Sequence, residues 1–167
     1  DGRPRLRPPA SDVTTHQLLT HTAGFGYDFF NETYRRLTAD HGVPAVATAT
    51  RASLRTPLLF DPGTEWEYGS GVDWAGQVIE AVTGRRLREV MAERVLDPLG
   101  MSDTGFALSD DARRRRAVLH MRKRGELVPN HRWEQPADPE IDMGGQGLWS
   151  TVPDYLTFLR MWLREGR

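Results

Sequence analysis

The feature that most constrains the fold is a set of short helical segments that end at glycine or proline. In the clearest of them, over about residues 71–83, apolar residues recur at steps of three and four: Val72, Ala75, Ile79 and Val82. That spacing predicts a helix with one apolar face. Ser70 and Asp73 predict a capping box at its beginning, and Gly84 predicts its end. Such a helix must pack its apolar face against another part of a fold.

Other helices are predicted along the chain. Thr14 and Gln17 predict a capping box for a short helix with Leu18 and Leu19 on its apolar face, ended by Gly24. A helix is expected over about 86–96 that Pro98 stops, and a last one begins at Thr151 and continues to the chain end at Gly166. Between Phe25 and Phe60 we expect loop and irregular helix, with a weakly indicated helix over about 43–51.

Strand signals are few. Residues 117–128 predict a β-hairpin that turns at Arg124-Gly125, and Asp61-Pro-Gly-Thr64 predicts a tight turn. Residues 65–68 alternate as an extended segment. The chain is therefore predicted to be mainly α with a short β-hairpin.

Composition excludes several classes of protein. The 167 residues suit a single domain, and no apolar run approaches the ~18 residues that a membrane-spanning helix needs. The net charge of −1 gives no general attraction to nucleic acid. The absence of cysteine removes disulfides, Cys-zinc sites and thiol nucleophiles, and leaves the compartment without a prediction.

A basic stretch allows two interpretations. Arg113–Arg116 with Arg122, Lys123 and Arg124 place 7 basic residues within 12 positions. A nucleic-acid patch is one interpretation. A solvated surface neutralised in part by Asp110, Asp111 and Glu126 is the other, and near-zero net charge favours it. We predict no nucleic-acid partner.

Common catalytic motifs are missing from the sequence. No serine has glycine two residues before and two after it, no His-Glu-x-x-His occurs, and Lys123 is flanked by arginines and not by the Gly and Ser/Thr of a phosphate loop. We expect no metal site and no cofactor.

Tyr68 stands immediately before the predicted helix start. A phenol there would feel the positive end of the helix dipole, which favours its anionic form and would suit a general base. On local sequence alone, a packed aromatic ring with its hydroxyl bonded to backbone is the more common outcome.

Four blocks occur in an order that resembles the serine beta-lactamase-related family. They are His16-Gln-Leu-Leu-Thr-His21-Thr-Ala-Gly24-Phe25, Phe60-Asp-Pro-Gly-Thr64 through Tyr68-Gly-Ser70, Leu96-Asp-Pro-Leu-Gly-Met101-Ser-Asp-Thr-Gly-Phe106, and Gly144-Gly-Gln-Gly-Leu-Trp-Ser150-Thr-Val-Pro-Asp-Tyr155. The family includes class C beta-lactamases, D-Ala-D-Ala carboxypeptidases, family VIII esterases and fungal statin-side-chain acyltransferases. The sequence around Tyr68 resembles the esterase and acyltransferase branch more than the lactamase branch.

The resemblance implies an α/β fold of the beta-lactamase/transpeptidase type and an acyl-serine mechanism on a small-molecule ester or amide. Tyr68 matches the family's catalytic tyrosine, and Ser70 stands where lactamases usually carry Asn. We therefore expect Ser70, Gly145 and Gln146 to bind substrate. Asp73 is expected to support the segment structurally, and the glycines near Gly145 permit close approach of either a ligand or a neighbouring strand.

The sequence departs from the family in one decisive respect. The Ser-x-x-Lys nucleophile is absent, because position 120 is His120 where Lys123 would require serine, and the late Lys-Thr-Gly or His-x-Gly motif is absent too. Residues 1–167 are thus interpreted as a single partial domain, the middle helical region of the fold. We expect it to be inactive alone, to lack the N- and C-terminal parts of the same fold, and to expose apolar helix faces. The alternative is a catalytically inactive scaffold or interaction domain of the same fold.

Overall fold

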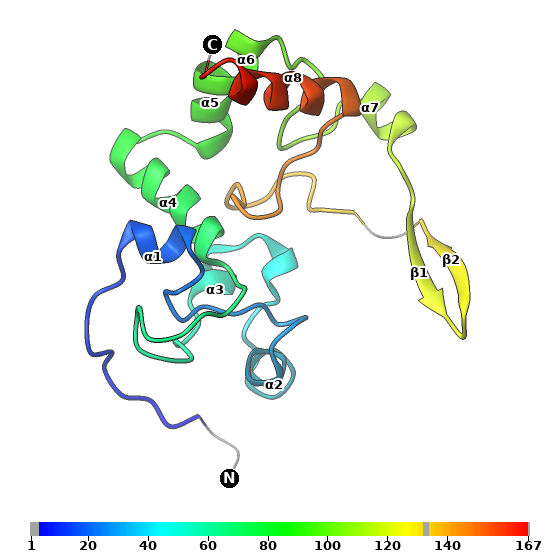
Figure 1. Cartoon of the computed structure of the whole chain (residues 1–167). Coiled ribbons are helices and arrows are strands. Elements are labelled where there is room, and N and C mark those ends of the chain that lie inside the picture. The colour runs from blue at the N-terminus through cyan, green and yellow to red at the C-terminus, as the bar shows by residue number, and fades with distance from the viewer. Residues whose placement is uncertain (1–3, 132–133, 167) are drawn as a thin grey trace. The chain divides into compact units, whose positions relative to one another are not determined.

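The computed structural model describes residues 4–131 and 134–166 and divides into two compact units (Figure 1). The first unit runs to Glu89 and takes in Pro139–Gly147, and the second holds Val90–Asp138 and the chain from Leu148 onward. In the described part of the chain, the elements are helical except for one β-hairpin. This confirms the predicted mainly-α character. None of the helices in the described part of the chain has the length and apolarity needed to cross a membrane.

The first unit begins with the predicted capped helix. In α1 (Thr15–Leu19) the Thr14 side chain and Gln17 form the expected capping box. The helix ends at Leu19, five residues before the predicted stop at Gly24, and only Leu18 is buried while Leu19 is 58% exposed. The turn over 61–64 forms as predicted, with Thr64 N donating to Asp61 O at 3.1 Å.

The region predicted as loop and irregular helix contains a regular helix. It is α2 (Glu32–His41), capped by Asn31, whose side chain accepts from the amides of Thr33 and Tyr34. The weak helix signal over 43–51 corresponds to a 3₁₀ turn, η1 (Val46–Thr48), followed by α3 (Arg51–Leu54). The prediction missed α2 because its apolar spacing is poor; its start is set by the Asn31 cap.

The helix α4 (Gly71–Thr83) has the predicted bounds and ends at Gly84, which is left-handed with φ 68°. The predicted capping box is wrong, because the Ser70 side chain makes no capping hydrogen bond. The buried residues of α4 are Gly71, Asp73 and Gly76. Its predicted apolar face is largely open, with Val82 81% exposed.

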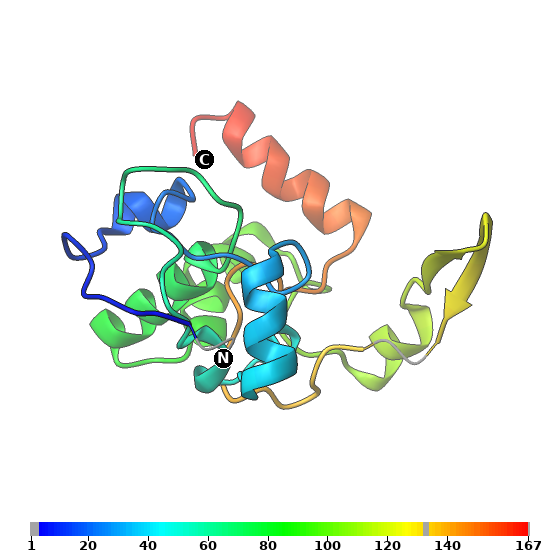
Figure 2. The same cartoon turned by 90° about the horizontal axis from the view of Figure 1, so that it is seen from below.

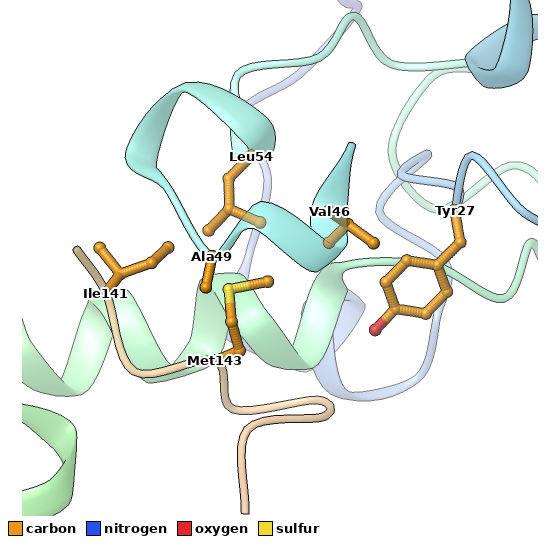
Figure 3. Close-up of a cluster of buried hydrophobic side chains, with 6 residues drawn as sticks. All are labelled: Tyr27, Val46, Ala49, Leu54, Ile141 and Met143. Carbon is orange, nitrogen blue, oxygen red and sulfur yellow. The ribbon is translucent and has the colours of Figure 1, made fainter. Parts of the chain in front are cut away.

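The core of the first unit lies between α3, α4 and the returning segment 139–147. Figure 3 shows its buried side chains: Tyr27, Val46, Ala49, Leu54, Ile141 and Met143. Trp74 of α4 packs against them and donates its indole N–H to Leu54 O at 3.2 Å. The returning segment adds a backbone bond from Ile141 N to Ala49 O at 3.1 Å.

A buried ion-pair cluster binds the segment 139–147 to the residues that follow α4. The side chain of Asp142 is fully buried and accepts from Arg86 Nη2 at 2.9 Å and from Arg88 Nη2 at 2.6 Å. The backbone amide of Arg88 also donates to it, at 3.0 Å. Burial alone would raise the pKa of Asp142, but these hydrogen bonds outweigh it and hold the pKa below its usual value.

In the second unit the helical run is longer than predicted. The elements α5 (Leu87–Met91), η2 (Ala92–Leu96) and α6 (Asp97–Leu99) follow one another, with α5 starting in the first unit. Pro98 does not stop the run, because it sits in the first turn of α6, where its missing N–H costs nothing. Gly100, left-handed with φ 68°, ends it.

The remaining elements of the second unit are α7 (Asp110–Arg115), the hairpin of β1 (Leu119–Lys123) and β2 (Glu126–Asn130), and α8 (Val152–Leu163), seen again in Figure 2. The hairpin turns at Arg124 and Gly125 as predicted, both with positive φ, 52° and 91°. Thr151 caps α8 as predicted, but the helix ends at Leu163 and does not continue to Gly166. An antiparallel bridge between Gly105 and Trp149 ties the chain before α7 to the chain before α8.

Candidate functional site

Tyr68 lies three residues before Gly71, the first residue of α4, and is 43% exposed. Two other tyrosines of the first unit are buried and use their hydroxyls: Tyr27 donates to Asp73 Oδ2 at 2.8 Å, and Tyr34 donates to Pro57 O at 2.7 Å. Among the described residues, the hydroxyl of Tyr68 has no such partner. A packed ring with a bonded hydroxyl, the alternative that the sequence allowed for Tyr68, is therefore found at Tyr27 and Tyr34. The side chain of Tyr68 is open instead.

Aromatic rings surround the Tyr68 side chain. Its ring centroid lies 4.8 Å from that of His21, 5.3 Å from Tyr27 and 5.8 Å from Phe30. Phe29 packs on Tyr27 and Phe30, and Trp66 packs on His21. Phe29, Phe30 and Trp66 are 57%, 67% and 64% exposed. One exposed apolar ring, Phe30, thus contacts the open phenol, and two more contact its ring neighbours.

Asp73 connects three segments beneath this surface. Its carboxylate is fully buried and accepts from the Tyr27 hydroxyl at 2.8 Å and from Gly145 N at 2.7 Å. The structure therefore joins the first turn of α4, the loop after α1 and the segment 144–147 through one side chain. The sequence predicted a supporting role for Asp73 but assigned it the wrong partner, Ser70.

Burial controls the acid–base character of this pair. It raises the pKa of Asp73, opposed by the hydrogen bonds from Gly145 and Tyr27. Burial also raises the pKa of Tyr27, and the neighbouring Asp73 charge adds to the effect. Tyr27 thus stays a protonated donor, which fits a structural hydrogen bond.

The glycines of the segment 144–147 permit close approach to the protein itself. A Cβ atom on Gly145 would stand 2.7 Å from the Tyr27 hydroxyl and 2.9 Å from Asp73 Oδ2, and one on Gly144 would stand 2.5 Å from Val72 O. The structure shows close approach to neighbouring chain at Gly144 and Gly145, and the neighbour is the start of α4 with Tyr27 and not a strand. Approach of a ligand to these glycines stays a prediction.

The other predicted substrate contacts have different surroundings. Gln146 is half-buried, and Ser70 is 3% exposed. The carbonyl of Ser70 accepts from Trp74 N at 3.0 Å in the first bonded turn of α4. The predicted residues Tyr68, Ser70, Asp73 and Gly145 thus lie at or beside the start of α4, while their roles toward substrate remain predictions.

Two contacts at this site carry no signal in the sequence. The spacing of Tyr27 does not point to Asp73, to which its hydroxyl donates. The Nδ1 of His21 accepts from the amide of Gly69 at 3.5 Å. No local signal links residues so far apart in sequence.

Other chemistry finds little support. Over residues 4–131 and 134–166, no group of three or more His, Asp or Glu side chains is arranged to hold a metal ion. The arginines of α7 are paired with acids: Arg115 with Asp111 and Asp103, both at 2.8 Å, and Arg113 with Glu134. This pairing agrees with the solvated-surface interpretation of the basic stretch.

Comparison with known proteins gives a consistent result. A family model described as Beta-lactamase matches residues 4–167. A lovastatin esterase from Penicillium rubens is 36% identical over 167 residues, 96% of this chain and 42% of that protein. Monacolin J acid methylbutanoyltransferase from Aspergillus terreus is 34% identical over 98% of this chain and 41% of its own length.

A solved structure gives the fold. Simvastatin synthase from Aspergillus terreus, in its LovD6 mutant form, superposes with a TM-score of 0.87 and 36% sequence identity over 99% of this chain and 40% of that one. The predicted beta-lactamase/transpeptidase-like fold is thereby confirmed. The chain spans about two fifths of the length of these relatives.

Proposed function

This chain belongs to the beta-lactamase family, and on that premise we propose that it is the tyrosine-bearing part of an acyl-serine enzyme of the esterase or acyltransferase type. Family members similar to it include an esterase and an acyltransferase. The observation that carries the proposal is the open Tyr68 at the start of α4, in contrast to the buried and hydrogen-bonded Tyr27 and Tyr34.

In the proposed reaction, Tyr68 handles the proton of a serine that a longer protein supplies. The Tyr68 oxygen acts as general base and takes the proton of the serine hydroxyl as the serine oxygen bonds to the ester carbonyl carbon. The carbonyl electron pair moves to oxygen and returns when the C–O bond to the leaving alcohol breaks. Tyr68 gives its proton to that alcohol, leaving an acyl-serine that water or a second alcohol then attacks by the same proton exchange.

The rings around Tyr68 favour a substrate with a sizeable apolar part. Phe30 offers exposed aromatic surface against the phenol, and Phe29 and Trp66 offer more against its ring neighbours. Apolar contact there stabilises binding in proportion to the area covered. We therefore expect esters of medium or long acyl chains to be preferred over acetyl esters.

A labelling experiment tests the reaction type. A fluorophosphonate bonds covalently to an activated serine, so it should label the full-length protein stoichiometrically. The 167-residue chain should stay unlabelled, because it lacks Ser-x-x-Lys. The labelled protein should also hydrolyse a p-nitrophenyl ester.

Two outcomes would overturn the proposal. A full-length protein that takes up no label and hydrolyses no ester would support the alternative of an inactive scaffold. Labelling of the 167-residue chain itself would show that a nucleophile lies within it, and the division of roles proposed here would be wrong.

A further inference from the structure

His21 has an unusual backbone conformation directly beside Tyr68. Its φ of 57° lies in the left-handed region, which residues other than glycine and asparagine seldom adopt. His21 lies two residues after Leu19, the last residue of α1, where the chain turns toward the segment that carries Tyr68. A non-glycine residue there is strained, and contacts around it must offset that strain.

The backbone and side chain of His21 hold the two neighbours of Tyr68. Its carbonyl accepts from Glu67 N at 3.0 Å, and its imidazole Nδ1 accepts a long hydrogen bond from Gly69 N at 3.5 Å. Tyr68 is thus bracketed on both sides by one residue. Since Nδ1 accepts, the ring proton of the neutral imidazole must be on Nε2.

The imidazole also supports the phenol ring. The two ring centroids are 4.8 Å apart with the planes inclined at 55°. Gly69 lies closely against the loop after α1, since a Cβ there would stand 2.2 Å from Phe25 O. The segment 67–69 thus contacts this loop through Gly69 and through the hydrogen bonds to His21.

We propose that His21 is a positioning residue for Tyr68, which fixes the place of the phenol oxygen by accepting from Gly69 through Nδ1 and by packing against the Tyr68 ring. The inference rests on the proposed catalytic role of Tyr68. His21 itself transfers no proton in this account. Its contribution is orientation, and a reacting group misplaced by about 1 Å can lose on the order of 10²-fold in rate.

Two substitutions separate the acceptor from the backbone conformation. His21→Gly and His21→Asn both allow a positive φ, but only asparagine keeps an acceptor near the position of Nδ1. In the full-length protein we expect His21→Gly to lower kcat for a p-nitrophenyl ester by roughly 10–100-fold with little change in KM. His21→Asn should restore most of that loss. His16→Asn, on the exposed side of α1, is the matched control and should leave kcat unchanged.

A second readout tests the geometry without catalysis. Loss of the imidazole should speed hydrogen exchange at the Gly69 amide in His21→Gly, while the Glu67 amide, bonded to a backbone carbonyl, keeps its protection. The His21 ¹⁵N shifts should report the Nε2–H tautomer. Asparagine should give an intermediate exchange rate at Gly69.

The outcomes distinguish this inference from the proposed function. If Tyr68→Phe lowers turnover while His21→Gly and His21→Asn both turn over at the wild-type rate, the positioning role is wrong and the function stands. Equal loss in both His21 variants with unchanged exchange at Gly69 would overturn the inference as stated, because the Nδ1 acceptor would then contribute nothing to the position of Tyr68. If Tyr68→Phe turns over at the wild-type rate, the proposed function fails, and a positioning role in catalysis fails with it.

Discussion

Two helices that begin with the same sequence pattern have different surroundings at their first turns. Both α4 and α8 carry a hydroxyl residue before the first turn and an aspartate at the third helical position, Asp73 and Asp154. In α8 the signal is a true cap, since Thr151 Oγ1 accepts from Asp154 N. Both aspartates also accept from distant chain. The half-buried Asp154 accepts from Asp103 N at 2.9 Å and from Thr104 Oγ1 at 2.8 Å, while Asp73 is fully buried and accepts from Tyr27 and Gly145. A capping pattern thus predicts a helix start, and burial distinguishes the two acids there.

The difference continues along both helices. The first turn of α4 is covered on the Leu18 side so closely that a Cβ on Gly71 would stand 2.4 Å from Leu18 O. No residue of α8 is buried, and its Trp162 and Leu163 are 67% and 86% exposed. A stable helix face of that kind normally packs on another layer. Residues that hold α4 should therefore cost more to remove than their counterparts in the second unit.

The largest expected loss is at Asp142. Its fully buried carboxylate is paired with Arg86 and Arg88, and removing one partner of a buried ion pair costs about 3–5 kcal/mol. Asp142→Ala should lower the free energy of unfolding by that amount in urea denaturation. Asp111→Ala is the matched control, because Asp111 also pairs with two arginines but is exposed. A loss of about 0–1 kcal/mol is expected there, and equal losses would contradict the contrast.

A somewhat smaller loss is expected at Asp73. Asp73→Ala leaves the Tyr27 hydroxyl and the Gly145 amide without their acceptor, which should cost about 2–4 kcal/mol of unfolding free energy. Asp73→Asn can accept from Gly145 and donate to Tyr27, so its cost should be below about 1 kcal/mol. Asp154→Ala, at the same place in α8, tests the comparison directly. A loss there as large as that of Asp73→Ala would break it.

For the residues at the N-cap positions we expect the larger loss of stability in α8 and the smaller one in α4. Thr151→Ala removes a working cap from α8 and should cost about 1 kcal/mol, while Ser70→Ala removes none from α4. Thermal unfolding of the two variants measures this contrast. A larger loss for Ser70→Ala would mean that the buried hydroxyl has a structural role that the capping geometry does not show.

The smallest effect concerns pH and the chain before α1. Hydrogen bonds from Arg7 and from Ala10 N lower the pKa of Asp61 to about 2. The folded pKa lies below the unfolded one, so this contribution to stability is present above about pH 4 and is lost as pH falls through about 2. Asp61→Asn should remove that part of the acid transition. Unfolding curves with the same acid slope in both proteins would contradict the assignment.

Much of the secondary structure could be predicted, and its failures have physical causes. The caps at Thr14 and Thr151, the end of α4 at Gly84 and the hairpin turn at Arg124-Gly125 were predicted correctly because each is decided by a few adjacent residues. Helix α2 was missed and Pro98 misread, since both depend on where a helical run begins. Such limits are set by caps and packing more than by periodicity.

The candidate site was predictable only in part. The family motifs place Tyr68 at the start of α4, and the glycines near Gly145 indicated close approach. The partners of Asp73 and the ring of His21 come from chain segments tens of residues away. Contacts of this kind are fixed by tertiary packing, which no local pattern in one sequence records.

The measurement that tests the central claim most directly is the rate of acyl-serine formation in the full-length protein. With a short-chain activated ester, rapid-quench mass spectrometry follows the acyl adduct in the wild type, in Tyr68→Phe and in Tyr155→Phe, whose exposed tyrosine lies on α8. The account predicts that Tyr68→Phe slows acylation by roughly 10²–10⁴-fold, the usual range for loss of a general base, and that Tyr155→Phe matches the wild type. Acylation of Tyr68→Phe at the wild-type rate would contradict it.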